Sequence, residues 1–115
     1  MADEDIPPVI DSILTSIKKL LGVAEDYTLF DPDIVIHINT AFMNLLQLGV
    51  GPEEGFSING SEAEWSDFMG TRADIEAIKS YIYLKVRLIF DPPQTGYLID
   101  AINKQILEYE WRLAA

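Results

Sequence analysis

The sequence predicts an all-α protein, a small antiparallel bundle of about four to five helices. Apolar residues recur at helical spacing along most of the 115 residues, and glycine- and proline-rich breaks separate these stretches. Hydrophobic residues make up 49% and charged residues 23%, the balance of a globular chain and not of a disordered one. We expect a single helical domain over residues 1–115, with residues 1–7 as a flexible tail.

Residues 8–21 are predicted to form the first helix. Its apolar stripe recurs every three or four residues: Ile10, Ile13, Leu14, Ile17 and Leu21. Lys18 and Lys19 lie near the negative end of the helix dipole, and Gly22 follows as a terminating residue.

The second helix is predicted over residues 32–48, with Asp31 or Asp33 as its cap. Its polar residues form only a narrow stripe: Asp33, His37, Thr40, Asn44 and Gln47. Ile36 and Met43 flank the core positions and add more apolar surface than one core contact requires. A helix of this kind is either central in a bundle or buried by a second molecule, and Ile36 and Met43 are candidate interface residues.

Glycines break the helical pattern between residues 49 and 60. Within the 50–61 loop, the alternation Phe56-Ser57-Ile58 before Asn59-Gly60 allows one short β-hairpin. Ser61 and Glu64 then have the spacing of a capping box. This box would start a short helix up to residue 70 that carries Trp65, Phe68 and Met69, with Trp65 folded onto the bundle.

Residues 73–90 are predicted to form a helix with two apolar faces, and the Asp91-Pro92-Pro93 segment ends it. The first face comprises Ile75, Ile78, Ile82, Val86 and Ile89. The second comprises Ala77, Tyr81, Leu84 and Leu88. Two apolar faces predict two packing partners, and Tyr81, Leu84 and Leu88 are candidate interface residues.

The last helix is predicted to run from Gly96 towards the C-terminus. Its core stripe is Leu98, Ile102, Ile106, Tyr109 and Leu113. Leu107 and Trp111 project away from this stripe, and exposed tryptophan is a recurrent anchor of protein interfaces. Both residues are candidate interface residues, and a place at the edge of the core is the alternative for Trp111.

Residue types that carry catalysis are scarce in this chain. It has no cysteine, so thiol chemistry, disulfides and the common structural zinc sites are excluded. Its single histidine, His37, has Asp33 and Asp31 nearby but no third nitrogen or sulfur ligand for zinc. The 49–55 loop lacks the lysine and serine or threonine of a phosphate-binding loop. The sequence predicts no catalytic residue, no metal site and no cofactor, and favours a binding protein over an enzyme.

The net charge of −11 narrows the class of partner. Binding to nucleic acid needs a cationic surface that displaces counterions from phosphates, and the net charge of this chain is negative. No apolar run is long enough to span a bilayer, so no membrane partner is expected either. A protein partner is therefore expected. The alternative is that the chain is an acidic DNA mimic or regulatory module that occupies a basic site on another protein.

Several segments together carry a family resemblance. They are ILTSIKKLLG at 13–22, DIVIHIN at 33–39, QLGVGP at 47–52, WSDF at 65–68, YIYLKVRLIFDPP at 81–93 and EWR at 110–112. The chain resembles the head–tail connector (adaptor) proteins of tailed bacteriophages, in the branch common in phages and prophages of Gram-positive bacteria. The resemblance covers roughly residues 10–113.

The resemblance implies a structural protein of the virion, assembled in the cytoplasm of the bacterial host. It implies a homo-oligomeric ring, a dodecamer in the virion, seated beneath the portal protein as a platform for the stopper and the tail. It also implies docking on the portal through the C-terminal segment, here residues 101–115. DNA would pass through the lumen of the ring without sequence-specific binding, which agrees with the net charge.

Overall fold

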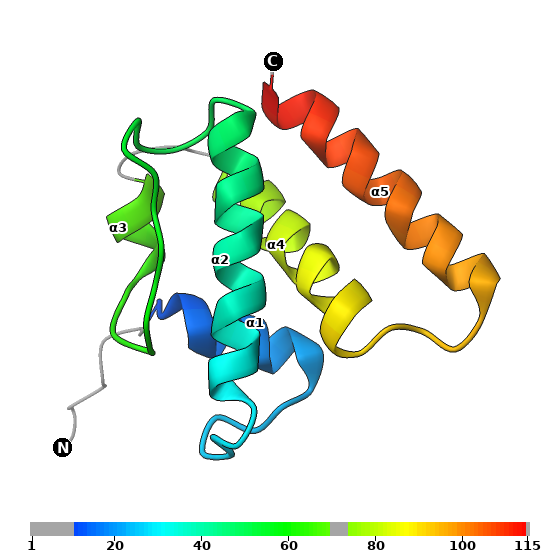
Figure 1. Cartoon of the computed structure of the whole chain (residues 1–115), viewed down its shortest axis with the longest axis horizontal. Helices are drawn as coiled ribbons and strands as arrows, with labels where there is room; N and C mark the ends of the chain where they lie inside the picture. The colour runs from blue at the N-terminus through cyan, green and yellow to red at the C-terminus, as the bar shows by residue number, and fades with distance from the viewer. Residues whose placement is uncertain (1–10, 70–73, 115) are drawn as a thin grey trace, which may run out of the picture.

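The computed structural model of the chain describes residues 11–69 and 74–114 (Figure 1). Over these residues it contains five helices and no sheet, which confirms the predicted all-α class. The helices are α1 (Ile13–Leu21), α2 (Asp31–Gln47), α3 (Trp65–Met69), α4 (Ile75–Phe90) and α5 (Gly96–Ala114). The expected tail at residues 1–7 lies outside the described residues. No helix in the described ranges is both long and apolar enough to cross a membrane.

The first helix begins later than its apolar pattern predicted. Ser12 is the N-cap and accepts a hydrogen bond from the Thr15 backbone N–H at 3.2 Å. Residues 11–13 are paired with a distant segment: the Ile13 N–H donates to the Ala63 carbonyl and the Trp65 N–H to the Asp11 carbonyl, both at 3.0 Å. This pairing keeps Asp11 and Ser12 out of the helix. Gly22 ends α1 in the left-handed conformation, as predicted.

Helix α2 is confirmed within one residue at each end, but its predicted cap is wrong. The N-cap is Phe30, whose side chain makes no capping bond, and Asp31 and Asp33 lie inside the first turn. The Asp31 carboxylate instead forms an ion pair of 2.8 Å with the Lys18 ammonium. The buried side of α2 packs mainly against α4. It consists of Ile34, Ile38, Ala41, Phe42 and Leu45.

The hairpin allowed by the sequence does not form in the 50–61 loop. The Asn39 side chain from α2 takes the place of a partner strand. It accepts from the Ile58 backbone N–H and donates to the Ile58 carbonyl, each at 2.8 Å. With both backbone groups satisfied and its side chain buried, Ile58 gains nothing from strand pairing.

The capping box expected at Ser61 and Glu64 is also wrong. Helix α3 begins at Trp65, and the Glu64 backbone N–H donates to the Asp67 carboxylate at 2.9 Å. The later start follows from the pairing of residues 63–65 with residues 11–13, which holds Ala63 and Glu64 in extended backbone. Trp65 is fully buried, as predicted. The next predicted residue of this helix, Gly70, lies outside the described residues.

Helix α4 is central and packs against α2, α5 and α1, so the prediction of two packing faces is confirmed. Its predicted start at Ala73 lies outside the described residues.

On α5, Ile102, Ile106 and Leu113 are buried and Tyr109 is half-buried, as predicted. Two core assignments are wrong: Ile89 is 60% exposed and Leu98 is 47% exposed. Both lie beside the α4–α5 connection, which holds the two helices apart at that end (Figure 1).

The core is one apolar cluster between α2 and α4, closed by α1, α3 and the 50–58 loop. Three aromatic rings join the loop to the helices. The centroid of Phe42 lies 5.0 Å from that of Phe56 and 4.7 Å from that of Phe68, and Phe56 and Phe68 are 5.3 Å apart. Gly51, with a φ of 97°, brings the backbone against the Phe68 ring, where a Cβ would collide with it.

Candidate protein-interaction surface

The outer side of α2 presents two of the predicted interface residues to solvent. Ile36 and Met43 are each 60% exposed and lie two turns apart. Both point away from α4 because the opposite side of α2 is buried in the core. Between them Thr40 is exposed, and its hydroxyl donates to the Ile36 carbonyl at 3.1 Å. The exposed surface of this stripe is therefore mostly aliphatic.

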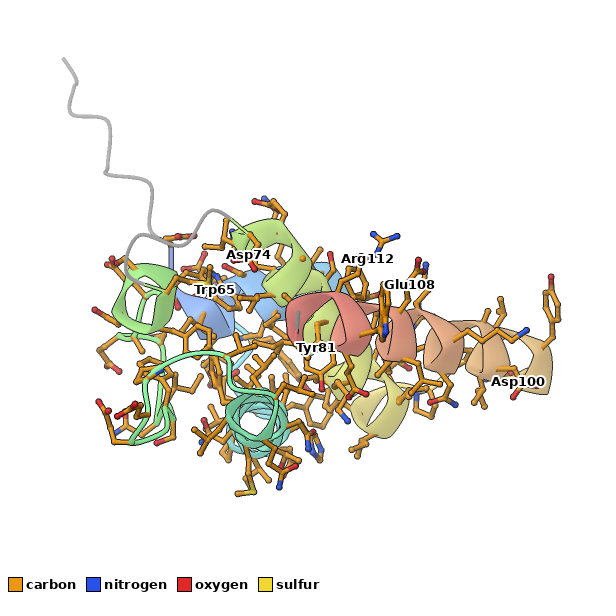
Figure 2. The ribbon with its side chains drawn as sticks, turned by 90° about the horizontal axis from the view of Figure 1, so that it is seen from above. Trp65, Asp74, Tyr81, Asp100, Glu108 and Arg112 are labelled. Carbon is orange, nitrogen blue, oxygen red and sulfur yellow. The ribbon has the colours of Figure 1, made fainter. Side chains whose placement is uncertain are left out.

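The outer side of α5 presents two more of the predicted interface residues to solvent. Leu107 is 65% exposed and Trp111 is 78% exposed, one turn apart. They are flanked by the charged pair Glu108 and Arg112, whose side chains form an ion pair of 2.7 Å and point outward (Figure 2). Large apolar side chains at this exposure leave much of their surface in water in the isolated subunit. Such a pair, set among charges, has the composition of a protein contact.

The remaining three predicted interface residues lie on α4, which packs against α5. Tyr81 is fully buried, Leu84 is 8% exposed and Leu88 is half-buried. The Tyr81 hydroxyl donates to the Glu110 carboxylate at 2.8 Å, and Figure 2 shows Tyr81 under α5. Burial raises the pKa of Tyr81 above its usual range, and the hydrogen bond and negative charge of Glu110 raise this pKa further. The second apolar face of α4 is thus covered within the subunit by α5.

A buried lysine organises the loop between α1 and α2. The Lys18 residue is 2% exposed, and its ammonium donates to the carbonyls of Glu25 and Tyr27, both at 2.9 Å. Together with the Asp31 carboxylate, these carbonyls surround the charge with oxygen atoms. Sequence reasoning placed Lys18 only at a helix end. Its spacing from Asp31 gave no sign of this contact, which depends on the path of the loop.

The loop held by Lys18 carries exposed apolar side chains that sequence reasoning missed. Leu29 is 68% exposed, Tyr27 47% and Phe30 38%. The Phe30 ring packs edge-on against Tyr27 at 5.7 Å and against Phe90, at the end of α4, at 5.4 Å. The signal in the sequence was a run of large apolar residues inside a turn-rich loop, where no core position was predicted.

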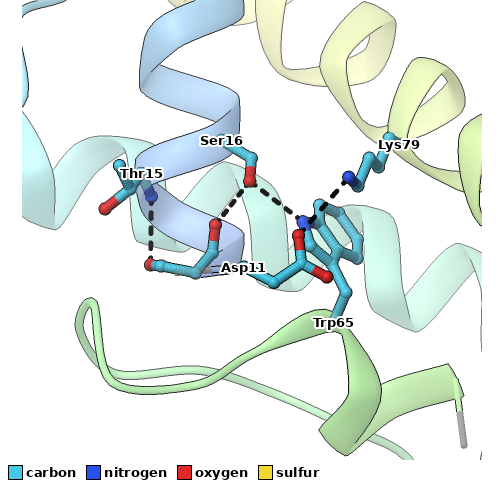
Figure 3. A network of polar contacts seen from close by, with 6 residues as sticks. Asp11, Thr15, Ser16, Trp65 and Lys79 are labelled. Atoms are coloured by element: carbon cyan, nitrogen blue, oxygen red, sulfur yellow. Dashed lines mark hydrogen bonds and ion pairs between the residues drawn. The ribbon is translucent and has the colours of Figure 1, made fainter. Parts of the chain in front are cut away.

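Trp65 is tied to α1 and α4 by polar contacts, which Figure 3 shows. Its indole N–H donates to the Ser16 hydroxyl at 3.1 Å, and this hydroxyl donates to the Ser12 carbonyl at 2.6 Å. The Lys79 ammonium lies 5.6 Å from the centre of a Trp65 ring and 3.5 Å from the Asp11 carboxylate. The network fixes α3 against α1, a role in folding.

His37 is partly exposed on α2, one turn after Asp33. Among residues 11–69 and 74–114, no three histidine, aspartate or glutamate side chains gather in a group that could hold a metal ion. Exposed apolar side chains of the described residues lie on α2, on α5 and in the loop between α1 and α2. The chain is thus a helical protein with large apolar side chains exposed on its surface.

Comparison with protein families places this chain in a known group. The family described as phage connector protein matches residues 13–115, and the chain belongs to this family. The family resemblance seen in the sequence is thereby confirmed at the level of phage connectors. Proteins of this family have a structural and not an enzymatic role. Searches of curated proteins and of solved structures found no match to the chain.

Proposed function

We propose that this protein is a head–tail connector (adaptor) subunit that forms a ring beneath the portal of a tailed phage. The ring links the DNA-filled head to the stopper and the tail during virion assembly in the host cytoplasm. Membership of the phage connector family supports this role. The observation that carries the proposal is the exposure of large apolar side chains on two separate helices, Ile36 and Met43 on α2 and Leu107 and Trp111 on α5.

The two exposed stripes serve different partners in this proposal. A closed ring needs two different complementary surfaces on each subunit, and the α2 stripe supplies one of them. The α5 stripe lies within residues 101–115 and serves the portal or the stopper. Trp111 suits this role because a tryptophan inserted into a partner's pocket buries a large area at low entropic cost.

The negative charge fits a ring through which DNA passes. Each subunit carries a net charge of −11, and repetition around a lumen multiplies the repulsion of phosphates. DNA can then move through the ring without being held. The alternative function, an acidic DNA mimic or regulatory module, has no support from the family match.

The proposal is tested with purified chain and the portal protein of the same phage. Size-exclusion chromatography with light scattering gives the mass of the chain alone, at rising concentration, and after mixing with portal. We expect a monomer or weak oligomer alone, and a portal complex containing many copies, visible by electron microscopy as an added ring. A chain that fails to bind portal at every salt concentration contradicts the proposed function.

A further inference from the structure

The loop between α2 and α3 carries the dipeptide Asn59-Gly60, for which the fold provides no cover. The loop runs along α2 and turns back towards α3 (Figure 1). It is fixed at two points: the Asn39 side chain binds the backbone of Ile58, and the carbonyl of Ala63 accepts a hydrogen bond from α1. Between these two points, residues 59–62 make no hydrogen bond to any other part of the chain that the structure describes.

The side chain of Asn59 and the backbone nitrogen of Gly60 can approach each other. Asn59 is exposed and Gly60 is half-buried, and both lie outside the helices in bent backbone. Glycine has no Cβ to shield its nitrogen, and it reaches backbone conformations that other residues rarely adopt. The dipeptide therefore has the accessibility and the conformational freedom that attack of this nitrogen on the side-chain amide requires.

The other asparagines of the chain lack this combination. Asn39 and Asn44 lie within α2 and Asn103 lies within α5, where the helix fixes the backbone around them. The residue that follows each of them has a bulky side chain in place of the hydrogen of glycine. Asn39 is held further, because both its amide oxygen and its amide nitrogen bind the backbone of Ile58. Asn59 alone is thus both unheld and followed by glycine.

We propose that Asn59 is a site of spontaneous deamidation in the folded chain. The Gly60 nitrogen attacks Cγ of Asn59, forms a new C–N bond and loses its proton to water. The bond between Cγ and Nδ2 breaks, and Nδ2 takes up a proton and leaves as ammonia. Water then opens the resulting five-membered succinimide ring at either of its two carbonyls, which gives aspartate or isoaspartate at position 59. The reaction consumes water and involves no oxidation or reduction.

Both products change the surface beside α2. The groove of about 560 Å³ between α2 and this loop has Ile36, Asn59 and Glu62 in its lining. The Glu62 carboxylate already lies against Gly60, since its Oε1 would be 2.8 Å from a Cβ placed there. Deamidation adds a second negative charge to this wall, so the surroundings of Ile36 become more acidic as the protein ages. The reaction itself does not depend on the proposed ring.

Incubation of the folded full-length chain at mildly alkaline pH tests the site, because removal of the Gly60 proton becomes faster as pH rises. Samples taken over several weeks are digested, at mildly acidic pH, with a protease that cleaves after glutamate. This cleavage releases residues 55–62, in which Asn59 is the only asparagine. Mass spectrometry should show that a carboxyl group replaces the amide in this peptide. Electron-transfer fragmentation should identify isoaspartate as well as aspartate.

Gly60→Ala is the matched control. Gly60 is not among the glycines with positive φ, and the atoms closest to a Cβ at this position belong to the flexible side chain of Glu62, so alanine fits. The added Cβ hinders the attack and narrows the backbone conformations, and should slow deamidation of Asn59 about tenfold. Circular dichroism and a thermal midpoint equal to those of the wild type verify that the variant is folded.

The chain unfolded in guanidinium chloride is the reference, because it gives the rate that the sequence alone allows. Conversion of the folded chain on the same time scale, with Asn39, Asn44 and Asn103 unchanged, supports the site. A folded chain that keeps Asn59 intact while the unfolded chain converts would show that the fold protects the dipeptide, and this overturns the proposal. Equal rates for wild type and Gly60→Ala, or aspartate without isoaspartate, overturn the route through the Gly60 nitrogen.

Discussion

Lys18 and Asp31 form an ion pair of 2.8 Å that joins the last turn of α1 to the first turn of α2. The Lys18 side chain is only 3% exposed, and the same ammonium also binds two carbonyls of the loop between the helices. A single charged group thus fixes the loop that carries Tyr27, Leu29 and Phe30. The pair has consequences for stability that can be measured.

Replacement of Lys18 by methionine, which has a similar length, should destabilise the fold by about 2–4 kcal/mol, because Asp31 and two loop carbonyls lose their partner. The free energy of unfolding in urea measures this loss. Lys19→Met is the matched control, since Lys19 is exposed, and should change stability by less than about 0.5 kcal/mol. Equal effects of the two substitutions would show that the buried contacts of Lys18 contribute nothing.

Tyr81→Phe removes the hydroxyl that donates to Glu110 and should cost about 1 kcal/mol near neutral pH. Because folding raises the pKa of Tyr81, its contribution is complete below the usual tyrosine pKa of about 10 and is lost as pH rises above that value. The stability difference between wild type and variant should therefore shrink at alkaline pH. Urea unfolding from neutral to alkaline pH checks this.

The control for Tyr81 is Tyr97→Phe, because Tyr97 is 82% exposed. Its substitution should leave both the neutral stability and the alkaline decline of the wild type unchanged. A difference between wild type and Tyr81→Phe that stays constant with pH would contradict the raised pKa that burial, and then the contact with Glu110, give to Tyr81.

Asn39→Ala should destabilise the protein by about 1–3 kcal/mol, because both backbone groups of Ile58 lose their partner while Ile58 is 5% exposed. The loop from Val50 to Ala63 should loosen at the same time. Thermal unfolding gives the first effect and limited proteolysis of the loop the second. Asn44→Ala on the same helix is the control, since its side chain makes no hydrogen bond to the described residues, and it should change neither.

Gly51→Ala and Gly49→Ala form a matched pair. Both glycines have positive φ, 97° and 81°, so alanine is strained at either position by about 1 kcal/mol. Only at position 51 does the new Cβ also collide with the Phe68 ring. We expect the larger loss of unfolding free energy at position 51, by a further 1–3 kcal/mol or so. The same loss at both positions would mean that the ring moves aside freely.

Trp111→Ala should weaken binding to the portal or stopper about 10–30-fold, the scale of an interface anchor, and leave folding stability within about 0.5 kcal/mol. Surface plasmon resonance on immobilised portal, and then on stopper, measures the affinity. Leu98→Ala, an exposed apolar residue of α5 outside residues 101–115, is the control and should bind normally. Normal binding of Trp111→Ala to both partners argues against the proposed role of the α5 stripe.

The periodicity of apolar residues was sufficient to predict the four longer helices, because each of them buries at least one side of its own pattern. It did not predict where α1 and α3 begin. Those ends depend on hydrogen bonds between residues 11–13 and 63–65, about fifty positions apart. The helix propensities of neighbouring residues do not report pairing between segments so far apart in the sequence. For the same reason the sequence did not predict the two hydrogen bonds between the Asn39 side chain and the Ile58 backbone.

Exposure of the interface candidates could be predicted only in part. Ile36 and Met43 lie opposite the one buried side of α2, so the helical pattern alone indicates their exposure. Tyr81 belongs to a second apolar face, and no pattern tells whether such a face meets another part of the chain or another molecule. The structure shows α5 lying on it. Leu20 was assigned to no surface, because the groove that it lines is made jointly by α1 and α4.

Helix α5 packs mainly against α4 and leaves much of its length in water. Its separation would remove its contacts with α4 but would leave the packing of α2 and α1 against α4 in place, so its opening costs less free energy than unfolding of the whole chain. Amide protons of α5 should then exchange with deuterium through a partial opening in which α2 and α4 stay protected. The C-terminal helix is in this sense a thermodynamically separate unit of the subunit, joined to the rest by one side.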